Sequence, residues 1–296
     1  MKQNMRQKNM QAYLFLSPFL VFITVLYILP AILTVIMAFT SLDSAFIWKF
    51  NGINNFRKIL MDPNTPIIAW NTVKYVGITI FLTVVLDLFF AIMTTYFIRD
   101  ERKGNIFKGI LMIPMITPAV VYSVLWLWLL EATPNGLANK VYMALGGSEP
   151  LNWIAQYPFV IIIAATLLTS IAYGTTVFSS AVKSIPENQF RAARVDGAGE
   201  WEIVRNIILP NLRFHITFIA LWETLGLLTN YVTIMLITNG GPGVQTEVWA
   251  LSAYHKAFSD SQYGYGAAIS LVLIVVVMVL MLVIGAVMHH QEKSRS

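Results

Sequence analysis

The chain has 296 residues, of which 57% are hydrophobic and only 12% are charged, and its formal net charge is +5. Soluble domains carry about a quarter charged residues, so this composition excludes an ordinary soluble domain. The absence of cysteine excludes disulfides, thiolate metal sites and thiol redox chemistry. The pI near 9.3 does not indicate nucleic-acid binding, because in so apolar a chain the positions of the cations relative to a membrane matter more.

Long uncharged runs follow one another along the chain. No Asp, Glu, Lys or Arg occurs at positions 9–42, 109–130, 150–182 or 261–291, and two further apolar segments each contain one acidic residue, Asp87 or Glu223. A helix that crosses the hydrocarbon core needs about 20 apolar residues, and each run is long enough. The sequence therefore predicts an all-α, polytopic membrane protein with a single transmembrane domain over residues 1–296. Its six spans are expected at about residues 11–40, 68–98, 106–130, 157–182, 214–237 and 265–288.

The distribution of positive charge predicts how the chain is oriented. Most of the 20 Lys and Arg residues lie before the first predicted span, after the second, after the fourth and after the sixth. Positive residues collect on the cytoplasmic side of a membrane, so both termini are predicted to be cytoplasmic. The first apolar run is longer than the apolar part of a signal peptide and no small-residue cleavage site follows it, so we interpret it as a retained span.

The segment 183–213, between the fourth and fifth predicted spans, contains charges, small residues and a turn. Pro186 suits a helix start and Glu187 complements the dipole of the first turn. Asp196 and Gly197 predict the turn that ends this helix. A second, amphipathic piece follows, with apolar residues at helical spacing at Trp201, Val204, Ile207 and Ile208, and Pro210 is expected to stop it.

Two interpretations of this segment are open from the residues alone. An inter-helix loop that packs on its own bundle explains the apolar residues of the second piece. A leading helix with little bulk at Ala192 and Ala193, flanked by Arg191 and Arg194, favours insertion into a cleft of a partner protein.

The stretch IPENQFRAARVDGAGEWEIVRNIILP at 185–210 resembles the cytoplasmic EAA loop of ABC importer permeases. In that family the loop contains a coupling helix that seats in a groove of the ATP-hydrolysing subunit. The family's usual glutamate before the two alanines is Arg191 here, so its ion pair with the ATPase is not carried over, and a reversed pair stays open. The resemblance implies that coupling to the ATPase involves Glu187, Arg191, Ala192, Ala193, Asp196 and Gly197.

Two external motifs extend this resemblance over nearly the whole chain. FNGINNFRKIL at 50–60, followed by Asn71 and Thr72, resembles the first external loop of carbohydrate permeases. LITNGGPGVQTEVWALSAYHKAF at 236–258 resembles the last external loop of their MalF-like branch. The alternative for its turn at Gly240, Gly241 and Pro242 is a tight loop without a role; the glycines also suit a surface on which an extracytoplasmic binding protein docks.

The resemblance implies the type I ABC importer permease fold and a place in a bacterial cytoplasmic membrane, surrounded by lipid. The chain would form half of the path for a sugar or oligosaccharide. Its implied partners are a second, related permease subunit, two ABC ATPase subunits and an extracytoplasmic solute-binding protein. No phosphate-binding G-x-x-x-x-G-K-[ST] loop is present, so the chain is not expected to hydrolyse ATP. ATP and Mg²⁺ would be bound by the ATPase, and no cofactor is expected in this chain.

Polar residues in the fourth and fifth predicted spans mark a candidate substrate path, because such groups usually face an interior or an aqueous route. Their hydroxyl, carboxylate and aromatic groups suit a sugar, and the resemblance implies a sugar site between these two helices. For any single Ser or Thr, a bond to the preceding turn is the simpler interpretation. The candidate residues are Thr169, Ser170, Tyr173, Glu223, Leu227, Asn230 and Tyr231.

Two other functional classes make different demands on the sequence from an ABC permease. An ion- or proton-coupled secondary transporter would use Glu223 or Asp87 as its coupling carboxylate. An intramembrane enzyme would need a convergent nucleophile, metal or acid–base set, and the sequence contains no such motif. For Asp87, a structural bond between helices is preferred over a contact with the partner permease.

Overall fold

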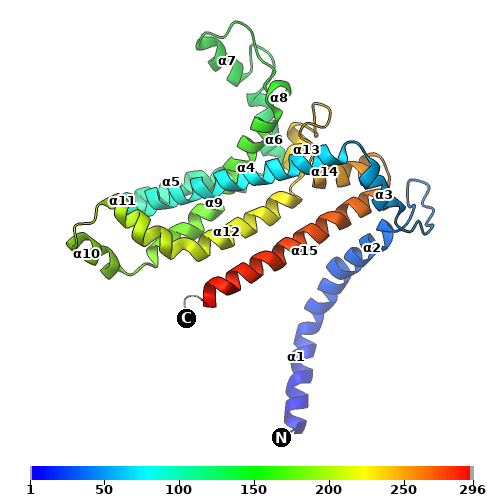
Figure 1. Cartoon of the computed structure of the whole chain (residues 1–296), viewed down its shortest axis with the longest axis horizontal. Helices are drawn as coiled ribbons and strands as arrows, with labels where there is room; N and C mark the ends of the chain where they lie inside the picture. Colours follow the sequence, from blue (N-terminus) through cyan, green and yellow to red (C-terminus); the bar gives the residue numbers. More distant parts are fainter. Residues whose placement is uncertain (1, 294–296) are drawn as a thin grey trace. The chain divides into compact units, whose positions relative to one another are not determined.

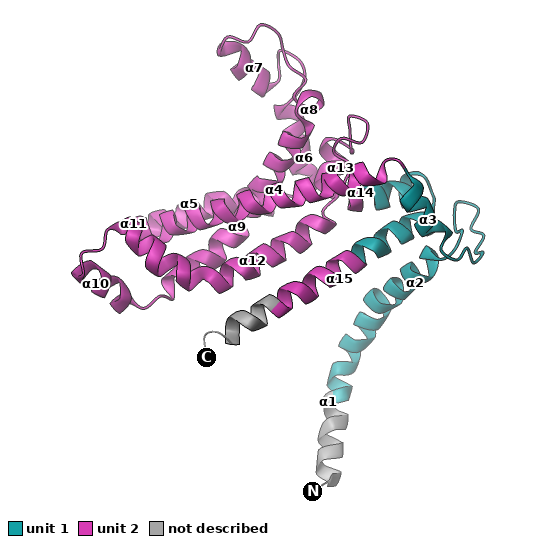
Figure 2. Cartoon of the chain, in the orientation of Figure 1, with its two compact units in different colours: residues 1–62, 252–274 teal, residues 63–251, 275–296 magenta. Residues whose placement is uncertain are grey.

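The computed structural model describes the backbone of residues 2–293 and the side chains of residues 13–286. Within these limits the chain is helical, with one isolated bridge between Thr40 and Phe50 and no longer strand, which confirms the all-α prediction. It divides into two compact units, residues 1–62 with 252–274 and residues 63–251 with 275–296 (Figure 2). The terminal Lys and Arg side chains used to predict the orientation lie outside the described side chains.

The first unit begins with an apolar helix that exposes its side chains. The run Tyr13–Ala38 has a mean hydropathy of 2.7, and none of the residues in its most apolar stretch is buried. This is expected of a helix that faces lipid. It confirms the first predicted span. Its helices are α1 (Lys2–Ile23), the π-turn η1 (Thr24–Ile28) and α2 (Leu29–Ala38), followed by α3 (Asn54–Met61), the π-turn η4 (His255–Ser259) and the start of α15 (Tyr263–Lys293).

A buried asparagine organises the end of α2. The Asn55 side chain is 2% exposed and donates to the carbonyls of Ala38 and Thr40 at 2.9 and 2.8 Å. Gly264, at the start of α15, lies so close to the Thr40 carbonyl that a Cβ would collide with it, and its N–H donates to the Leu42 carbonyl. These contacts fix α2, α3 and α15 within the first unit.

The second unit contains the remaining helices. In Figure 1 its long helices α4, α9 and α12 run side by side, and they pack on one another. The unit consists of α4 (Thr65–Ile92), η2 (Met93–Phe97), α5 (Glu101–Ile116), α6 (Ala119–Leu129), α7 (Leu137–Ala144), α8 (Trp153–Gln156), α9 (Pro158–Lys183), α10 (Glu187–Val195), α11 (Glu200–Ile203), η3 (Val204–Ile208), α12 (Leu209–Thr229) and α13 (Val232–Ile237), with α14 (Trp249–Tyr254) at its boundary.

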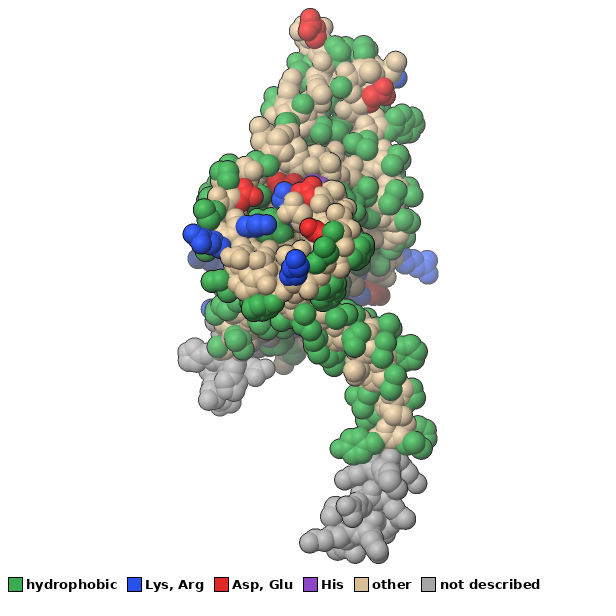
Figure 3. Space-filling view, turned by 90° about the vertical axis from the view of Figure 1, so that its right-hand side faces the viewer, with side chains coloured by type: hydrophobic (Ala, Val, Ile, Leu, Met, Phe, Trp, Pro, Cys, Tyr) green, Lys and Arg blue, Asp and Glu red, His purple; other side chains and the backbone are tan. Residues whose placement is uncertain are grey.

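Four described helices are long and apolar enough to cross a membrane, and they match four predicted spans: Tyr13–Ala38, Thr65–Phe97, Pro158–Lys183 and Tyr263–Ala286. Helices α5 and α6 meet this criterion together but bend by 96° at the break before Ala119. Pro118 lacks an amide hydrogen to continue the helix, which explains the break at this point. Large hydrophobic side chains are exposed along these helices. On the face shown in Figure 3, hydrophobic side chains are spread over the flanks and charged ones gather near the centre.

The predicted fifth span, 214–237, is a broken helix. Helix α12 ends at Thr229 because Asn230 takes an extended conformation, with φ −75° and ψ 111°, and α13 resumes at Val232. By length and composition the described residues thus provide up to five crossings, and the count of six stays a prediction.

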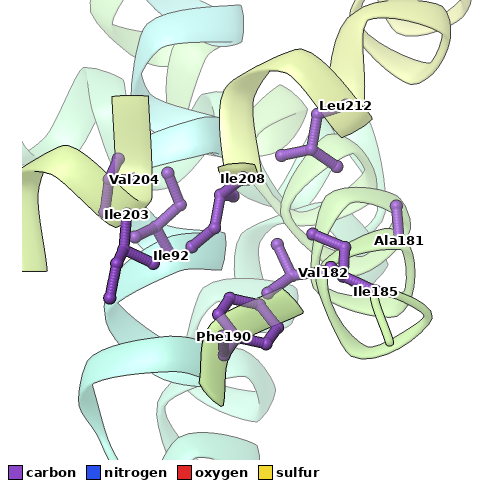
Figure 4. Packing of buried hydrophobic residues seen from close by; sticks show 9 residues of the cluster. All are labelled: Ile92, Ala181, Val182, Ile185, Phe190, Ile203, Val204, Ile208 and Leu212. Carbon is purple, nitrogen blue, oxygen red and sulfur yellow. The ribbon is translucent and has the colours of Figure 1, made fainter. Parts of the chain in front are cut away.

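Apolar residues beneath α10 form a compact cluster, which we call the α10 core. It joins the ends of α4 and α9 to α10, α11, η3 and the start of α12 (Figure 4). The amphipathic piece predicted after the Gly197 turn buries Val204 and Ile208 as expected, whereas its Trp201 is 75% exposed. The core consists of Ile92, Ala181, Val182, Ile185, Phe190, Ile203, Val204, Ile208 and Leu212.

The winding of η3 explains why Trp201 lies outside. Residues Val204–Ile208 form a π-turn, whose bonds reach one residue further than in an α-helix, so Ile203 joins Val204 on the buried face. Pro210 does not stop this piece as expected. It lies where the π-turn η3 passes into α12, and the helical backbone continues through it.

Candidate functional site

Helix α10 has an inner and an outer face. Phe190 is 8% exposed, stacks on Tyr96 with ring centroids 5.7 Å apart and belongs to the α10 core. Ala193 is half-buried against that core, whereas Ala192 is exposed. The two predicted alanines therefore have different surroundings, and only Ala192 belongs to a surface that a partner can reach.

Charged residues on the outer face pair within the helix. Arg191 Nε lies 3.6 Å from Glu187 Oε1, one turn earlier, and both side chains are largely exposed. An exposed pair of this kind contributes roughly 0–1 kcal/mol, so it leaves both groups available to a partner. The predicted turn is present: Asp196 ends the helix, Gly197 takes a left-handed φ of +83°, and the Ala198 N–H donates to the Ala193 carbonyl at 2.9 Å.

Two polar contacts that sequence reasoning missed connect the loop to the helix ends. The Lys183 ammonium pairs with the Glu101 carboxylate and thereby links the end of α9 to the start of α5. The Tyr96 hydroxyl donates to the Glu200 carboxylate and links η2 to α11. The partners are 82 positions apart in the first pair and 104 in the second. Because they are so distant in the sequence, no local pattern indicates which residues pair.

A buried tyrosine on α4 contacts both helices that carry the predicted substrate path. Tyr75 is fully buried on α4; its hydroxyl lies 3.0 Å from Thr166 Oγ1, and the Asn230 amide donates to it at 3.4 Å. Non-helical backbone at membrane depth is tolerated where it is buried in protein or lines a cavity, so the break at Asn230 and Tyr231 marks an interior position. Sequence analysis missed Tyr75, although a hydroxyl within an apolar run signals a buried partner.

Two aromatic rings from these helices lie close together, and an acidic residue follows one of them in sequence. The rings of Tyr173 on α9 and Trp222 on α12 are 6.3 Å apart, and Trp222 is 55% exposed. Glu223 follows Trp222 in α12 and is half-buried. The two predicted path helices thus contribute a pair of aromatic rings and a half-buried carboxyl.

Three other predicted path residues have more ordinary surroundings. The Thr169 hydroxyl donates to the Thr166 carbonyl at 2.8 Å, the simpler interpretation for a membrane-helix threonine. Leu227 is only 4% exposed and packs inside the bundle. Ser170 is half-buried on α9.

The Asp87 side chain links two helices by hydrogen bonds. It is fully buried on α4, and its Oδ1 accepts from the backbone N–H and the hydroxyl of Thr175 on α9 at 3.0 and 3.1 Å. Gly174 leaves the space that its carboxyl fills, because a Cβ there would overlap Asp87 Oδ2. The structural interpretation of this residue therefore agrees with the geometry.

The last external loop is anchored on the start of α4. The Asn71 amide donates to the carbonyls of Val244 and Glu247 at 2.8 and 3.2 Å, and Thr72 Oγ1 accepts from the Trp249 N–H at 2.8 Å. Asn71 and Thr72, which follow the first external motif in sequence, therefore hold the last external loop.

The predicted docking turn lies on this anchored loop. Gly240 is buried and has a left-handed φ of +82°, Gly241 is half-buried and Pro242 is exposed. Side chains of Thr238 and Thr246 meet at 2.8 Å beneath the turn. The turn is therefore held in one conformation with its tip accessible.

Replacing Asn71 by leucine is expected to loosen this loop. Leucine has a similar size but cannot donate, so two carbonyls lose their partners at a cost of about 1–3 kcal/mol each. Amide hydrogen exchange in residues 238–247 should accelerate about tenfold or more. Lys74→Leu, on the same helix, is the control, and equal exchange in the two variants would contradict the anchoring role.

The fold defines a polytopic, all-α membrane protein with a broken helix, buried polar contacts between its long helices and an amphipathic loop packed on the helix ends, an arrangement typical of membrane transporters. Residues 87–296 match the family described as binding-protein-dependent transport system inner membrane component, and the chain belongs to this family. It is an inner-membrane component of such a system.

Relatives and solved structures agree with this assignment. The trehalose/maltose transport system permease protein MalF of Thermococcus litoralis is 28% identical over 263 residues, which cover 87% of this chain and 86% of that one. The arabinooligosaccharides transport system permease protein AraP of Bacillus subtilis is 26% identical over 265 residues, 88% and 83% of the two chains. A crystal structure of a bacterial ABC transporter involved in the import of the acidic polysaccharide alginate matches with a TM-score of 0.85 and 18% identity over 96% of each chain, which confirms the ABC importer permease fold.

Proposed function

We propose that this chain is a permease subunit of an ATP-driven importer and forms half of the translocation path for a sugar or oligosaccharide. The family match over residues 87–296 carries the proposal. The names of MalF and AraP, which specify trehalose/maltose and arabinooligosaccharides, support the sugar class. The rings of Tyr173 and Trp222 offer a stacking surface and the carboxyl of Glu223 offers hydrogen bonding, the two kinds of contact that sugar recognition requires.

The complete importer would contain a second, related permease subunit, two ABC ATPase subunits and an extracytoplasmic solute-binding protein. ATP and Mg²⁺ would be held by the ATPases, and this chain would hold no cofactor of its own. Both termini and α10 would face the cytoplasm. The turn Gly240–Pro242 would face outward, where the anchoring by Asn71 presents it to the binding protein.

Helix α10 would transmit the closure of the ATPases to the membrane helices. Its outer surface, with Glu187, Arg191 and Ala192, would sit on an ATPase. Its inner side is packed through Phe190 on a core that contains the ends of α4 and α9. A displacement of α10 is therefore passed to these helices, because packed cores do not deform continuously.

The sugar would pass the broken part of the fifth helix. Asn230 and Tyr231 interrupt α12 and α13, and half-helices of this kind often frame substrate sites in transporters. Glu223 and Tyr173 would contact the sugar directly. Thr169, Ser170 and Leu227 would shape the wall behind them.

A pull-down and a transport assay together test the proposal. The chain is tagged at its C-terminus and purified gently, and a second permease and an ATPase are expected to accompany it. Uptake into vesicles should require ATP and binding protein. Uptake by this chain alone that collapses with an ion gradient would contradict the proposal and point to a secondary transporter.

Glu223→Ala is expected to weaken sugar transport without affecting assembly. A hydrogen bond to a charged group is worth about 1.5–3 kcal/mol, so the KM for uptake should rise about tenfold or more. Thr217→Ala, on the same helix with its hydroxyl bonded to the Arg213 carbonyl, is the matched control. Unchanged kinetics in Glu223→Ala would remove this residue from the path.

A further inference from the structure

A basic pocket lies between α10 and the ends of two membrane spans. Its volume is about 400 Å³, and its walls come from the end of η2, the end of α9 and α10. Arg99, Lys183 and Arg194 contribute one cation from each of these three parts, and the aromatic rings of Tyr96 and Phe190 form one wall. Val182 and Ile185 supply apolar surface, and Figure 4 shows them near Phe190. This combination suits a ligand with both an anionic and an apolar part.

The charges that line the pocket favour an anion. Glu187 is the one carboxylate among the lining residues, and it already lies 3.6 Å from Arg191. Lys183 pairs with Glu101, which is 71% exposed, so that pair is accessible to water and weak. For Arg99, no acidic partner occurs within the described residues. Arginine binds phosphate oxygens with two parallel hydrogen bonds, which makes Arg99 a strong anion ligand of the pocket.

The position of the pocket indicates where the anion comes from. The span Thr65–Phe97 ends beside Arg99 and the span Pro158–Lys183 ends within the lining, so the pocket lies at the level of the lipid head groups. The proposed orientation places this level at the cytoplasmic leaflet, whose anionic lipids occupy basic pockets between membrane helices. We propose that this pocket binds the phosphate head group of an anionic phospholipid, with the apolar surface against the start of an acyl chain.

A lipid in this pocket would act on coupling. It would touch α10 and the ends of both spans at once, and so would stiffen the connection that the proposed function assigns to the α10 core. The inference rests on the proposed orientation, but lipid binding can be measured without transport.

Native mass spectrometry of the purified protein, with the subunits that accompany it, tests the inference. After washing with neutral detergent and addition of phosphatidylglycerol, the unaltered protein should retain a bound phosphatidylglycerol. Arg99→Gln should lower its occupancy about tenfold, the loss expected for a charge-assisted hydrogen bond of 1.5–3 kcal/mol. Arg102→Gln, which removes an exposed cation outside the pocket, should leave occupancy unchanged.

Two outcomes would overturn the inference. One is equal retention of phosphatidylglycerol in the two variants. The other is its displacement by millimolar inorganic phosphate or glycerol phosphate, which would assign the pocket to a free phosphate. If no ATPase accompanies the chain, the proposed function fails, while the lipid occupancy of the two variants is still decided by the same spectra.

Discussion

Replacing Ala192 by tryptophan is expected to abolish sugar uptake and its coupled ATP hydrolysis while the membrane-inserted fold stays intact. Ala192 lies on the exposed face of α10, whereas Phe190 and Ala193 face the α10 core. The added ring therefore leaves the packing of the chain unchanged and obstructs the surface that would seat in the ATPase. Inserting a large side chain into a closely fitted contact costs about 3 kcal/mol, so the rate of ATP-dependent uptake should fall about a hundredfold.

ATP-dependent uptake into proteoliposomes measures this effect, and size-exclusion chromatography verifies that the chain is folded. Lys103→Trp is the control, because it adds the same bulk at an exposed position of α5 outside the α10 segment. A substitution at Gly197 is less informative. Its left-handed φ of +83° strains any side chain by about 1–2 kcal/mol, so a loss of function there has a second cause. Uptake at the unaltered rate in Ala192→Trp would falsify the docking role of α10.

The sequence predicted the helices that are continuous and uniformly apolar. The spans that begin at Tyr13, Thr65, Pro158 and Tyr263 agree with the runs expected from composition, because length and hydropathy alone determine such helices. The predictions were less complete where the backbone departs from a regular helix. The 96° bend before Ala119 and the break at Asn230 depend on how the surrounding helices satisfy the freed backbone groups, which hydropathy does not encode.

In the candidate site, too, features set by neighbouring residues were predicted and contacts between distant residues were not. Local signals predicted the α10 helix, the turn at Gly197 and the acidic start at Glu187, since each depends on neighbouring residues. Contacts between distant residues were not predicted. Tyr75 with Thr166 and Tyr96 with Glu200 are such contacts, and a single sequence contains no record of which helices pack together.

Replacing Gly174 by valine is expected to destabilise the protein strongly. A Cβ at this position would overlap the Asp87 carboxyl, which is fully buried and hydrogen-bonded to Thr175. The substitution would separate α4 from α9 and remove the acceptor for the Thr175 N–H and hydroxyl. Overpacking costs about 1–3 kcal/mol and the lost hydrogen bonds cost a similar amount, so Tm should fall by about 5 °C or more.

Two further variants separate packing from charge at this contact. Gly77→Val is the control on α4, because no atom lies within 4 Å of a Cβ built there. Asp87→Asn keeps the oxygen that accepts from Thr175, so its Tm should change by less than a few degrees and transport should continue. Thermal unfolding of the purified variants decides the matter: equal Tm values for Gly174→Val and Gly77→Val would contradict the close packing of α4 on α9. Loss of uptake in Asp87→Asn, with an unchanged Tm, would instead show that the charge of Asp87 serves transport and that a helix bond alone does not account for the residue.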